Sequence, residues 1–360
     1  MSGDSFAFQK LLMSSSYIGL FHCDFQQRSP VHLASYYGQY DILTILVKLF
    51  PNEVNRADKN GYTPLDLACQ KPNQEKCVEE IVTQPTFSVL ERNPKNYMTL
   101  INACKYGYSK ALTLLLSDTR IPIPQELDIT GANLYLIACK SNKLDILMAL
   151  SNDKRVKTVY FDRNLQGPLH YVCSSKNCNR SVVEYVISSG VDPNIQDKNG
   201  QTALHFSCSM SNVDAVECLL KLPNINVNLL NKDITAPIHI ACSLTSNDIL
   251  NKLMEHPKID LNILDREKRS PLILAVVLQK KDIVKQLIFN PKVELNKFDK
   301  EFRTPFYIAC SNQDVESVSL FLSSKKPLNL KALCSAAKFS ALESISVNKR
   351  NSMFYNFASE

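Results

Sequence analysis

The sequence has few glycines and no long apolar run. Only nine of its 360 residues are glycine, and no glycine-rich phosphate-binding loop, nucleophile elbow or metalloprotease helix motif is present. No segment reaches the roughly 18 to 20 uninterrupted apolar residues that a membrane-spanning helix needs, and no basic segment precedes an apolar run at the N-terminus. We therefore expect no enzymatic activity and no cofactor. We also expect a cytoplasmic or nuclear protein that does not bind or enter a membrane.

Charge of one sign is also scarce. The net charge of +6 is modest for 360 residues and falls short of the concentrated basic patch that a nucleic-acid-binding protein needs, so we expect no nucleic-acid partner. Hydrophobic residues make up 45% of the chain, which is enough apolar material for a long core.

The sequence does contain one motif at a regular spacing. SPVHLA at residues 29–34 returns in variants every 34 or 35 residues, as far as TPFYIA at residues 304–309. A chain with this period is a stack of copies of one supersecondary unit, none of which buries its apolar face alone. The residues that close the copies, here termed marker residues, are Ala34, Ala68, Ala103, Ala138, Val172, Ser207, Ala241, Ala275 and Ala309.

The residues around each motif predict a turn before it and a second helix after it. Turns are expected at residues 58–61 and 197–200, where Asn-Gly permits the positive φ of a tight hairpin turn. Seven residues after the marker an acidic residue recurs, followed by apolar residues at helical spacing, and a carboxylate there suits the positive end of a helix dipole. These acidic residues are Asp41, Asp145, Asp214, Asp248, Asp282 and Glu316.

The order of turn, helix and helix, with its threonine-proline-leucine-histidine start, resembles the ankyrin repeat family. TALH at residues 202–205, APIHIA at 236–241 and TPLDLA at 63–68 carry the resemblance best. It implies an all-α repeat solenoid of helix-turn-helix units with short β-turn fingers, stacked into a curved array. We expect nine units over residues 25–330, an N-terminal capping half-repeat over 1–24, a C-terminal capping helix pair over 331–347 and a flexible tail over 348–360.

The chain departs from the family pattern between the two helices. The family's glycine is present there only as Gly38 and Gly107, and Asn142, Thr245, Gln279 and Gln313 stand in its place elsewhere. Less uniform turns are therefore expected. Extra residues at 70–76 and 174–180 are expected to form enlarged inter-helix loops, because stacking surfaces do not absorb insertions.

The placement of the cysteines predicts buried free thiols. Equivalent positions on stacked helices lie about 8 to 10 Å apart, whereas a disulfide needs Cα atoms about 4.4 to 6.8 Å apart. A role in the core and a reducing compartment follow. The seven cysteines that directly follow a marker residue are Cys69, Cys104, Cys139, Cys173, Cys208, Cys242 and Cys310.

Histidines also belong to the repeat, at His32, His170, His205 and His239. The resemblance implies that they form hydrogen bonds that shape the turn and the first helix. Because they are spread along the chain, no catalytic or metal site is expected. Cys173 and Cys178 near His170 are zinc-ligand types, but their positions in the core and in an insertion do not favour zinc.

Several units end in an asparagine, at Asn55, Asn194, Asn228, Asn262 and Asn296. We expect these side chains to brace their turns by hydrogen bonds to the backbone. In ankyrin proteins such asparagines can also be substrates of an asparaginyl hydroxylase.

A partner is expected on the concave surface that the fingers and the exposed side of the first helices line in ankyrin-like stacks. Tyrosine supplies a large contact area at low entropic cost, so tyrosines there are candidate anchors. The alternative is that some of these rings only cover the core. The positions expected to be exposed stand nine, eight and six residues before each marker residue and two and three residues after it. The candidates at these positions in the N-terminal third are Phe25, Tyr36, Tyr37, Lys59, Tyr62, Tyr97, Lys105 and Tyr106.

Later fingertips carry positive charge at a step of about 10 Å, one helix diameter. They would suit an acidic protein partner, although neighbouring aspartates also allow an ordinary solvated row. The residues concerned are Arg163, Lys198, Lys232, Arg266 and Lys300, joined by Arg269 and Arg303.

The sequence therefore predicts a monomeric, non-catalytic protein-protein interaction scaffold that binds an unidentified protein partner. Alternatives are a substrate-recruiting adaptor of a regulatory or ubiquitin-ligase complex and, with less support, an enzyme. The adaptor interpretation rests on residues 328–334, which are similar to an elongin-binding box, although Lys338 stands where that box has an apolar residue.

Overall fold

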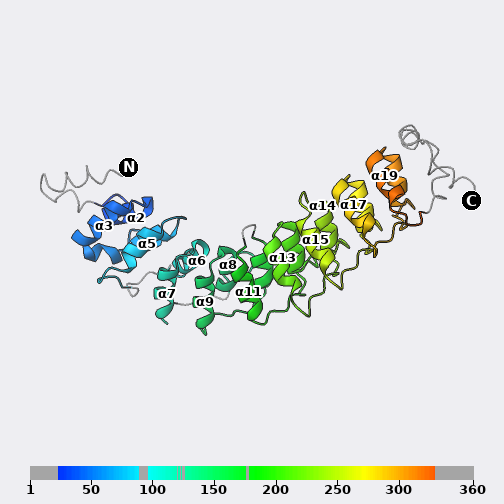
Figure 1. Ribbon diagram of the computed structural model, residues 1–360. Coiled ribbons are helices and arrows are strands. Elements are labelled where there is room, and N and C mark those ends of the chain that lie inside the picture. Colours follow the sequence, from blue (N-terminus) through cyan, green and yellow to red (C-terminus); the bar gives the residue numbers. More distant parts are fainter. Residues whose placement is uncertain are drawn as a thin grey trace, which may run out of the picture. The chain divides into compact units, whose positions relative to one another are not determined.

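A computed structural model of the chain describes residues 23–88 and 96–328, apart from residues 120, 122, 124, 125, 176 and 177 and the side chains of residues 96 and 97. The chain divides into two compact units, Met1–Ser175 and Lys176–Glu360, here termed the N-terminal and C-terminal units. In each unit, short helices follow one another in chain order (Figure 1). The predicted caps and tail lie outside the described residues, apart from residues 23 and 24.

The N-terminal unit consists of first helices and second helices in alternation. Its helices are α2 (Pro30–Tyr37), α3 (Tyr40–Leu49), the 3-10 helix η2 (Pro51–Asn55), α4 (Pro64–Cys69), α5 (Glu75–Val82), α6 (Asn96–Tyr106), α7 (Ser109–Ser117), α8 (Leu134–Ser141), α9 (Leu144–Asn152) and α10 (Pro168–Cys173).

The C-terminal unit continues the same alternation. Its helices are α11 (Arg180–Ser188), α12 (Ala203–Ser209), α13 (Val213–Leu220), α14 (Pro237–Ser243), α15 (Asp248–Glu255), α16 (Pro271–Val277), α17 (Lys281–Phe289), α18 (Pro305–Ser311) and α19 (Val315–Ser323).

Within each unit the helices pack in two layers. In the N-terminal unit α2, α4, α6, α8 and α10 follow one another in one layer and α3, α5, α7 and α9 in the other, and in the C-terminal unit α12, α14, α16 and α18 form the corresponding first layer. Apolar side chains such as Leu46, Leu147 and Leu250 are buried. No strand occurs in the described ranges. The predicted all-α repeat solenoid is therefore confirmed.

First helices begin where the motif places a capping residue before a proline. Thr304 Oγ1 accepts a hydrogen bond of 3.1 Å from the N–H of Tyr307, and Ser270 Oγ accepts one of 3.3 Å from the N–H of Ile273. The following proline lacks an N–H and has a fixed φ, which suits the first turn of a helix.

Several turns between paired helices are more uniform than the sequence suggested, whereas the turn after α14 differs as predicted, since Leu244 is extended and Thr245 has no positive φ. Gly38 has φ of 67°, and Asn142, Gln279 and Gln313 take similar values of 57°, 55° and 56°. A left-handed non-glycine residue costs roughly 1 kcal/mol or more. The hydrogen bond that closes the turn offsets this cost, since the next N–H donates to the carbonyl of the marker residue at 2.9 Å for Lys280 to Ala275 and 3.0 Å for Asp314 to Ala309. The prediction of irregular turns was wrong at these positions.

The described residues of both predicted insertions lie in loops, which end where α5 and α11 begin, at Glu75 and Arg180. The loop at residues 70–74 is fastened to its neighbours. The Tyr108 hydroxyl donates to the Lys71 carbonyl and accepts from the Gln74 N–H at 3.1 Å, and Gln74 Nε2 donates to the Tyr36 carbonyl at 3.2 Å. This loop therefore links three successive repeats.

Candidate functional site

Six of the described fingers are each built around one carboxylate or amide side chain. Asp58 Oδ1 accepts hydrogen bonds from the N–H groups of Asn60 and Tyr62 at 2.8 and 2.9 Å. Asp162, Asp197, Asn231, Asp265 and Asp299 form the same pair of bonds in their own fingers. These side chains brace the finger backbone, as short polar side chains do in turns.

The Asn-Gly pairs supply one left-handed residue to a finger, where a type I′ hairpin turn requires two. Gly61 and Gly200 have φ of 80° and 73°, whereas Asn60 and Asn199 are not among the residues of positive φ. A side chain at position 200 would also place its Cβ 2.9 Å from the N atom of Lys232 in the next finger. Glycine there allows two fingers to approach closely.

Backbone hydrogen bonds join neighbouring fingers within each unit. The N–H of Lys59 donates to the Gln26 carbonyl at 2.8 Å, and the N–H of Lys300 donates to the Glu267 carbonyl at 2.9 Å. Arg163 and Lys232 are joined to the preceding finger in the same way. These bonds hold the fingertips that they join side by side.

Most of the predicted basic fingertips are ion-paired. Each of three fingertips pairs with an acid of the preceding finger. The charged groups are 2.6 Å apart in Arg163–Glu126, 3.9 Å in Arg266–Asp233 and 3.5 Å in Lys300–Glu267. Lys198 and Lys232 have no ion pair with the described residues.

Arg269 and Arg303 bind the aspartate of their own finger, each with 2.8 Å between Nε and a carboxylate oxygen of Asp265 or Asp299. These contacts reduce the positive charge that the fingertips offer to a partner.

Tyrosine and lysine side chains stack at the ends of the first helices in the N-terminal unit. The rings of Tyr36 and Tyr37 meet edge to face with their centroids 5.1 Å apart. Lys71 Nζ lies 3.7 Å from the centroid of the Tyr36 ring and 5.3 Å from that of the Tyr37 ring. The two repeats that follow contain Lys105 and Lys140, each two residues after its marker residue, whereas Lys71 stands three residues after Ala68.

These lysines also lie over aromatic rings. Lys105 Nζ is 5.2 Å from the Tyr106 ring centroid, and Lys140 Nζ is 4.7 Å from that of Tyr171. A lysine ammonium within about 6 Å of a tyrosine ring is attracted to it. The set termed here the tyrosine–lysine row consists of Tyr36, Tyr37, Lys71, Lys105, Tyr106 and Lys140.

The candidates in the N-terminal unit divide between fingertips and helix ends. Phe25 and Lys59 are exposed fingertip residues, and Phe25 is 86% exposed. Tyr37 is 51% exposed at a helix end, beside the half-buried Tyr36. Tyr106 and Tyr62 are also half-buried, Tyr62 at the base of its finger, and the side chain of Tyr97 is outside the described residues. Half-burial leaves part of each described tyrosine available to a partner.

The sequence interpretation missed two members of the row. Lys71 stands three residues after Ala68, and Lys140 stands two residues after Ala138. These are the same register positions that identified Tyr36 and Tyr37, so the register could have found both lysines. Ile129, a fingertip residue that is 92% exposed, was missed as well, although it stands nine residues before its marker as Phe25 and Lys59 do.

The motif histidines are buried structural links. His205 Nδ1 accepts from the Thr202 N–H at 3.1 Å, and its Nε2 lies 2.9 Å from the Thr235 carbonyl of the next finger. His32 and His239 form equivalent contacts. Because Nδ1 accepts, Nε2 carries the proton in a neutral ring. Burial holds the pKa of His32 and of His239 below the usual value.

The cysteines that follow the markers keep reduced thiols, and all but the half-buried Cys310 are buried. Burial raises the pKa of Cys242 to about 12 and that of Cys310 to about 11. Such thiols are protonated at neutral pH and react slowly. Their predicted packing role is confirmed.

The asparagines at the repeat ends connect neighbouring repeats instead of bracing their own turns. Asn228 Nδ2 donates to the Lys258 carbonyl at 2.8 Å, and its Oδ1 accepts from the Asp260 N–H at 3.0 Å. Asn55, Asn194 and Asn262 form the same two-bond bridge, here termed an amide bridge. The prediction had the right bond type but the wrong partner, because the acceptor and donor lie 30 to 32 residues further along the chain.

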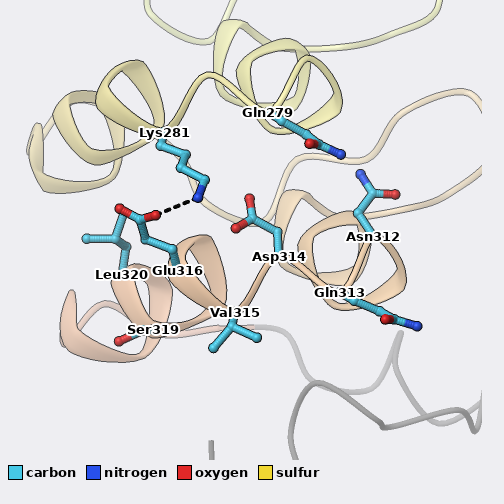
Figure 2. Close-up of a pocket in the computed structure, with 9 residues that line it drawn as sticks. All are labelled: Gln279, Lys281, Asn312, Gln313, Asp314, Val315, Glu316, Ser319 and Leu320. Carbon is cyan, nitrogen blue, oxygen red and sulfur yellow. Dashed lines mark ion pairs between the residues drawn. The ribbon is translucent and has the colours of Figure 1, made fainter. Parts of the chain in front are cut away.

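A depression of about 600 Å³ lies beside the turns before α17 and α19 (Figure 2). Its lining includes the amides of Gln279, Asn312 and Gln313, and the exposed ion pair between Lys281 and Glu316, 2.7 Å apart, lies at one side. None of these groups is a buried nucleophile or base. In the described part of the chain, no three His, Cys, Asp or Glu residues form a cluster that could hold a metal ion.

None of the helices in the described ranges combines the length and the apolarity that crossing a membrane requires.

A family model described as ankyrin repeats in three copies matches residues 1–93, 100–197, 169–265 and 222–299. These matches cover most of the sequence. The chain therefore belongs to the ankyrin repeat family.

Curated relatives share only part of their length with this chain. It is 22% identical over 192 residues to ankyrin repeat protein nuc-2 of Neurospora crassa, which covers 53% of this chain and 17% of that protein. It is 27% identical over 211 residues to transient receptor potential cation channel subfamily A member 1 of Drosophila melanogaster, covering 54% of this chain and 17% of that protein.

A third relative is the nuclear factor NF-kappa-B p105 subunit of Gallus gallus, 28% identical over 138 residues, which make up 35% of this chain and 14% of that protein. In all three the match spans less than a fifth of the relative's length.

Proposed function

We propose that this chain is a non-catalytic protein-interaction scaffold of nine repeats, and that its protein partner binds to the tyrosine–lysine row of the N-terminal unit. Ankyrin repeats in general are protein-protein interaction modules. The observation that supports this location is the stack of Tyr36, Tyr37 and Lys71, in which aromatic rings and a cation are ordered at the surface. Ordered aromatic side chains lose little entropy when a partner covers them.

The fingertips are a less well supported location for the partner. Carboxylates pair with Arg163, Arg266 and Lys300, so an acidic partner there would have to compete with existing ion pairs. Phe25, Lys59 and Ile129 are exposed on the fingers of the N-terminal unit and would extend its contact surface.

The proposal is tested by the double substitution Tyr36→Ala and Tyr37→Ala. Affinity capture from the cells in which the protein occurs should recover at least about tenfold less partner, as expected when a central aromatic anchor is removed. The thermal unfolding midpoint should change little, because Tyr37 is half exposed and neither ring belongs to the buried core.

Tyr185→Ala provides the matched control, since Tyr185 is a half-buried tyrosine on the second helix α11 of the C-terminal unit. It should leave capture intact. A large fall in the unfolding midpoint of the double variant would show that Tyr36 and Tyr37 belong to the core and would reject them as anchors.

A further inference from the structure

We propose that the rings of Tyr36 and Tyr37 bind a cationic side chain of the partner, and that Lys71 occupies this site until the partner displaces it. The two rings are termed here the aromatic corner. This inference rests on the proposed function, and it specifies the chemistry of the partner and an internal contact that limits its binding.

The aromatic corner holds an ammonium against two rings that stand nearly perpendicular to each other. The ring planes of Tyr36 and Tyr37 differ by 82°, and Lys71 Nζ lies 3.7 Å from the centroid of the first ring and 5.3 Å from that of the second. Among the described rings, Lys105 and Lys140 each lie over one. The face of an aromatic ring attracts a cation. The occupant that the chain itself supplies therefore indicates the ligand chemistry, an alkylammonium group.

The backbone around the aromatic corner is fixed without help from the Lys71 ammonium. The Lys71 carbonyl accepts a hydrogen bond from the Tyr108 hydroxyl. The buried Gln74 side chain donates through Nε2 to the Tyr36 carbonyl at 3.2 Å. The loop and the rings should therefore keep their positions when the Lys71 side chain leaves the corner.

The Lys71 side chain itself is held weakly. Within the described residues its ammonium forms neither an ion pair nor a hydrogen bond, so the two ring contacts are what orders it. Tyr37 is 51% exposed, which leaves the corner open to solvent. An exposed contact of this kind favours the bound side chain by a factor of only about two to five. The corner is then empty for roughly a sixth to a third of the time, and a partner's cation can enter it.

The aromatic corner suits a cation that needs no hydrogen-bond acceptor. A primary ammonium has three N–H donors, and no described residue accepts one from Lys71 Nζ. A trimethylated lysine has no such donor to leave unpaired when a partner excludes water from the corner. We therefore expect trimethyllysine to bind more tightly than unmodified lysine.

Removing Lys71 distinguishes this site from a surface that binds acids. If a carboxylate of the partner bound the Lys71 ammonium, Lys71→Ala would weaken binding. If Lys71 instead competes with the partner for the rings, the substitution makes the corner permanently available. Binding should then strengthen by about threefold to sixfold, the inverse of the fraction of time for which the corner is empty.

The test is nuclear magnetic resonance of the full chain with labelled tyrosine rings. The probes are the N-acetyl amides of lysine, trimethyllysine and norleucine. The ring signals of Tyr36 and Tyr37, assigned from the single variants Tyr36→Leu and Tyr37→Leu, should shift with both cations, and at lower concentration with trimethyllysine. They should not shift with the neutral norleucine compound. In Lys71→Ala the dissociation constant of each cation should fall by about threefold to sixfold.

Lys76→Ala is the matched control. Lys76 is an exposed residue of the same unit, and its ammonium lies 5.9 Å from the centroid of the Tyr40 ring. The substitution removes the same charge and leaves the aromatic corner intact, so the dissociation constants should stay as they are in the unmodified chain. Both variants should keep the far-ultraviolet circular dichroism of that chain.

The inference is wrong if the norleucine compound shifts the same signals at the same concentrations, because the corner would then be only an apolar patch. It is also wrong if Lys71→Ala does not strengthen binding of the cations. Equal strengthening by Lys76→Ala would overturn it as well, because that result would reflect the net charge of the unit alone.

Capture of the native partner separates this inference from the proposed function. Lys71→Ala should increase the amount of partner recovered, and the trimethyllysine compound should reduce it. If Lys71→Ala reduces capture while Tyr36→Ala with Tyr37→Ala also does, only the inference fails and the proposed function stands. If the tyrosine variant captures the partner normally, the proposed function fails, and the titration decides separately whether the corner binds a cation.

Discussion

The two units use amide bridges to different extents. In the C-terminal unit, amide bridges from Asn194, Asn228 and Asn262 each contact the following repeat through two hydrogen bonds. In the N-terminal unit, Asn55 forms one such bridge, and the Arg155 guanidinium connects its repeat to the preceding one. It donates to the carbonyls of Leu116, Asp118 and Ile121 at 2.7, 3.3 and 3.1 Å.

The difference extends to surface charge. Both units contain ion-paired fingertips, such as Arg266 with Asp233 and Arg163 with Glu126, but only in the N-terminal unit do lysines after the first helices, Lys71, Lys105 and Lys140, lie over tyrosine rings. One repeat geometry thus supports an aromatic, lysine-bearing surface in one unit and none in the described part of the other. Repeat stacking constrains the buried positions and leaves the exposed ones free to differ.

The largest effect is expected from Arg155→Ala. The substitution removes three hydrogen bonds from a charged donor and its ion pair with Asp153, so the free energy of unfolding should fall by about 2 to 3 kcal/mol. Urea denaturation would measure the loss of unfolding free energy, and hydrogen exchange of the backbone amides of α7 should become faster. Arg180→Ala removes only solvent-accessible ion pairs in the C-terminal unit and should cost clearly less than Arg155→Ala. Equal losses of unfolding free energy in the two variants would show that Arg155 does not stabilise the contact between repeats.

A smaller effect is expected from Asn228→Ala, at about 1 kcal/mol, because water can replace the two bonds of this amide bridge. Faster exchange of the Asp260 amide would locate the change at the bridge. The matched control is Asn251→Ala, an exposed helix position where alanine is the better helix former, so stability should not fall. Unchanged exchange at Asp260 would contradict the bridge.

The smallest effect is expected from acidification between pH 7 and pH 6. His32 in the N-terminal unit and His239 in the C-terminal unit have pKa values below the usual one because they are buried. Unfolded histidine titrates near pH 6.5 and binds more protons in this window than the folded form does, so stability is complete above that pH and falls as the pH is lowered. The loss should be less than about 1 kcal/mol for each histidine. Thermal unfolding of the full chain would measure it, and a midpoint that rises on acidification would contradict it.

Much of the fold follows from the spacing of the marker residues. The motif specifies the first helix through its cap and proline, and the acidic residue seven positions after the marker stands in the first turn of the second helix, as Asp41, Asp145 and Asp248 do. These features depend on residues a few positions apart, which is why one sequence was sufficient to predict them. The inter-helix turns were mispredicted because the closing hydrogen bond to the marker carbonyl allows Gln279 and Gln313 a conformation usually taken by glycine.

The candidate site could be predicted only in part. Register placed Tyr36 and Tyr37 at a helix end, but no local pattern shows that the Lys71 side chain from the next repeat lies over their rings. The partners of Asn228 are likewise 30 to 32 residues away, beyond the local turn that a short polar side chain usually serves. Contacts between repeats can be identified only in the stacked structure, because an asparagine side chain can form hydrogen bonds either within its own turn or with the neighbouring repeat.

The amide bridges have a consequence for how the gene encoding this array could change. Asn194, Asn228, Asn262 and Asn296 follow one another at intervals of 34 residues. Deleting residues 228–261 would bring Asn262 to the place of Asn228, and duplicating them would insert another copy, with matching donors and acceptors at each new junction. Unequal recombination in this part of the coding sequence would therefore change the number of repeats without requiring a second mutation to repair the junction.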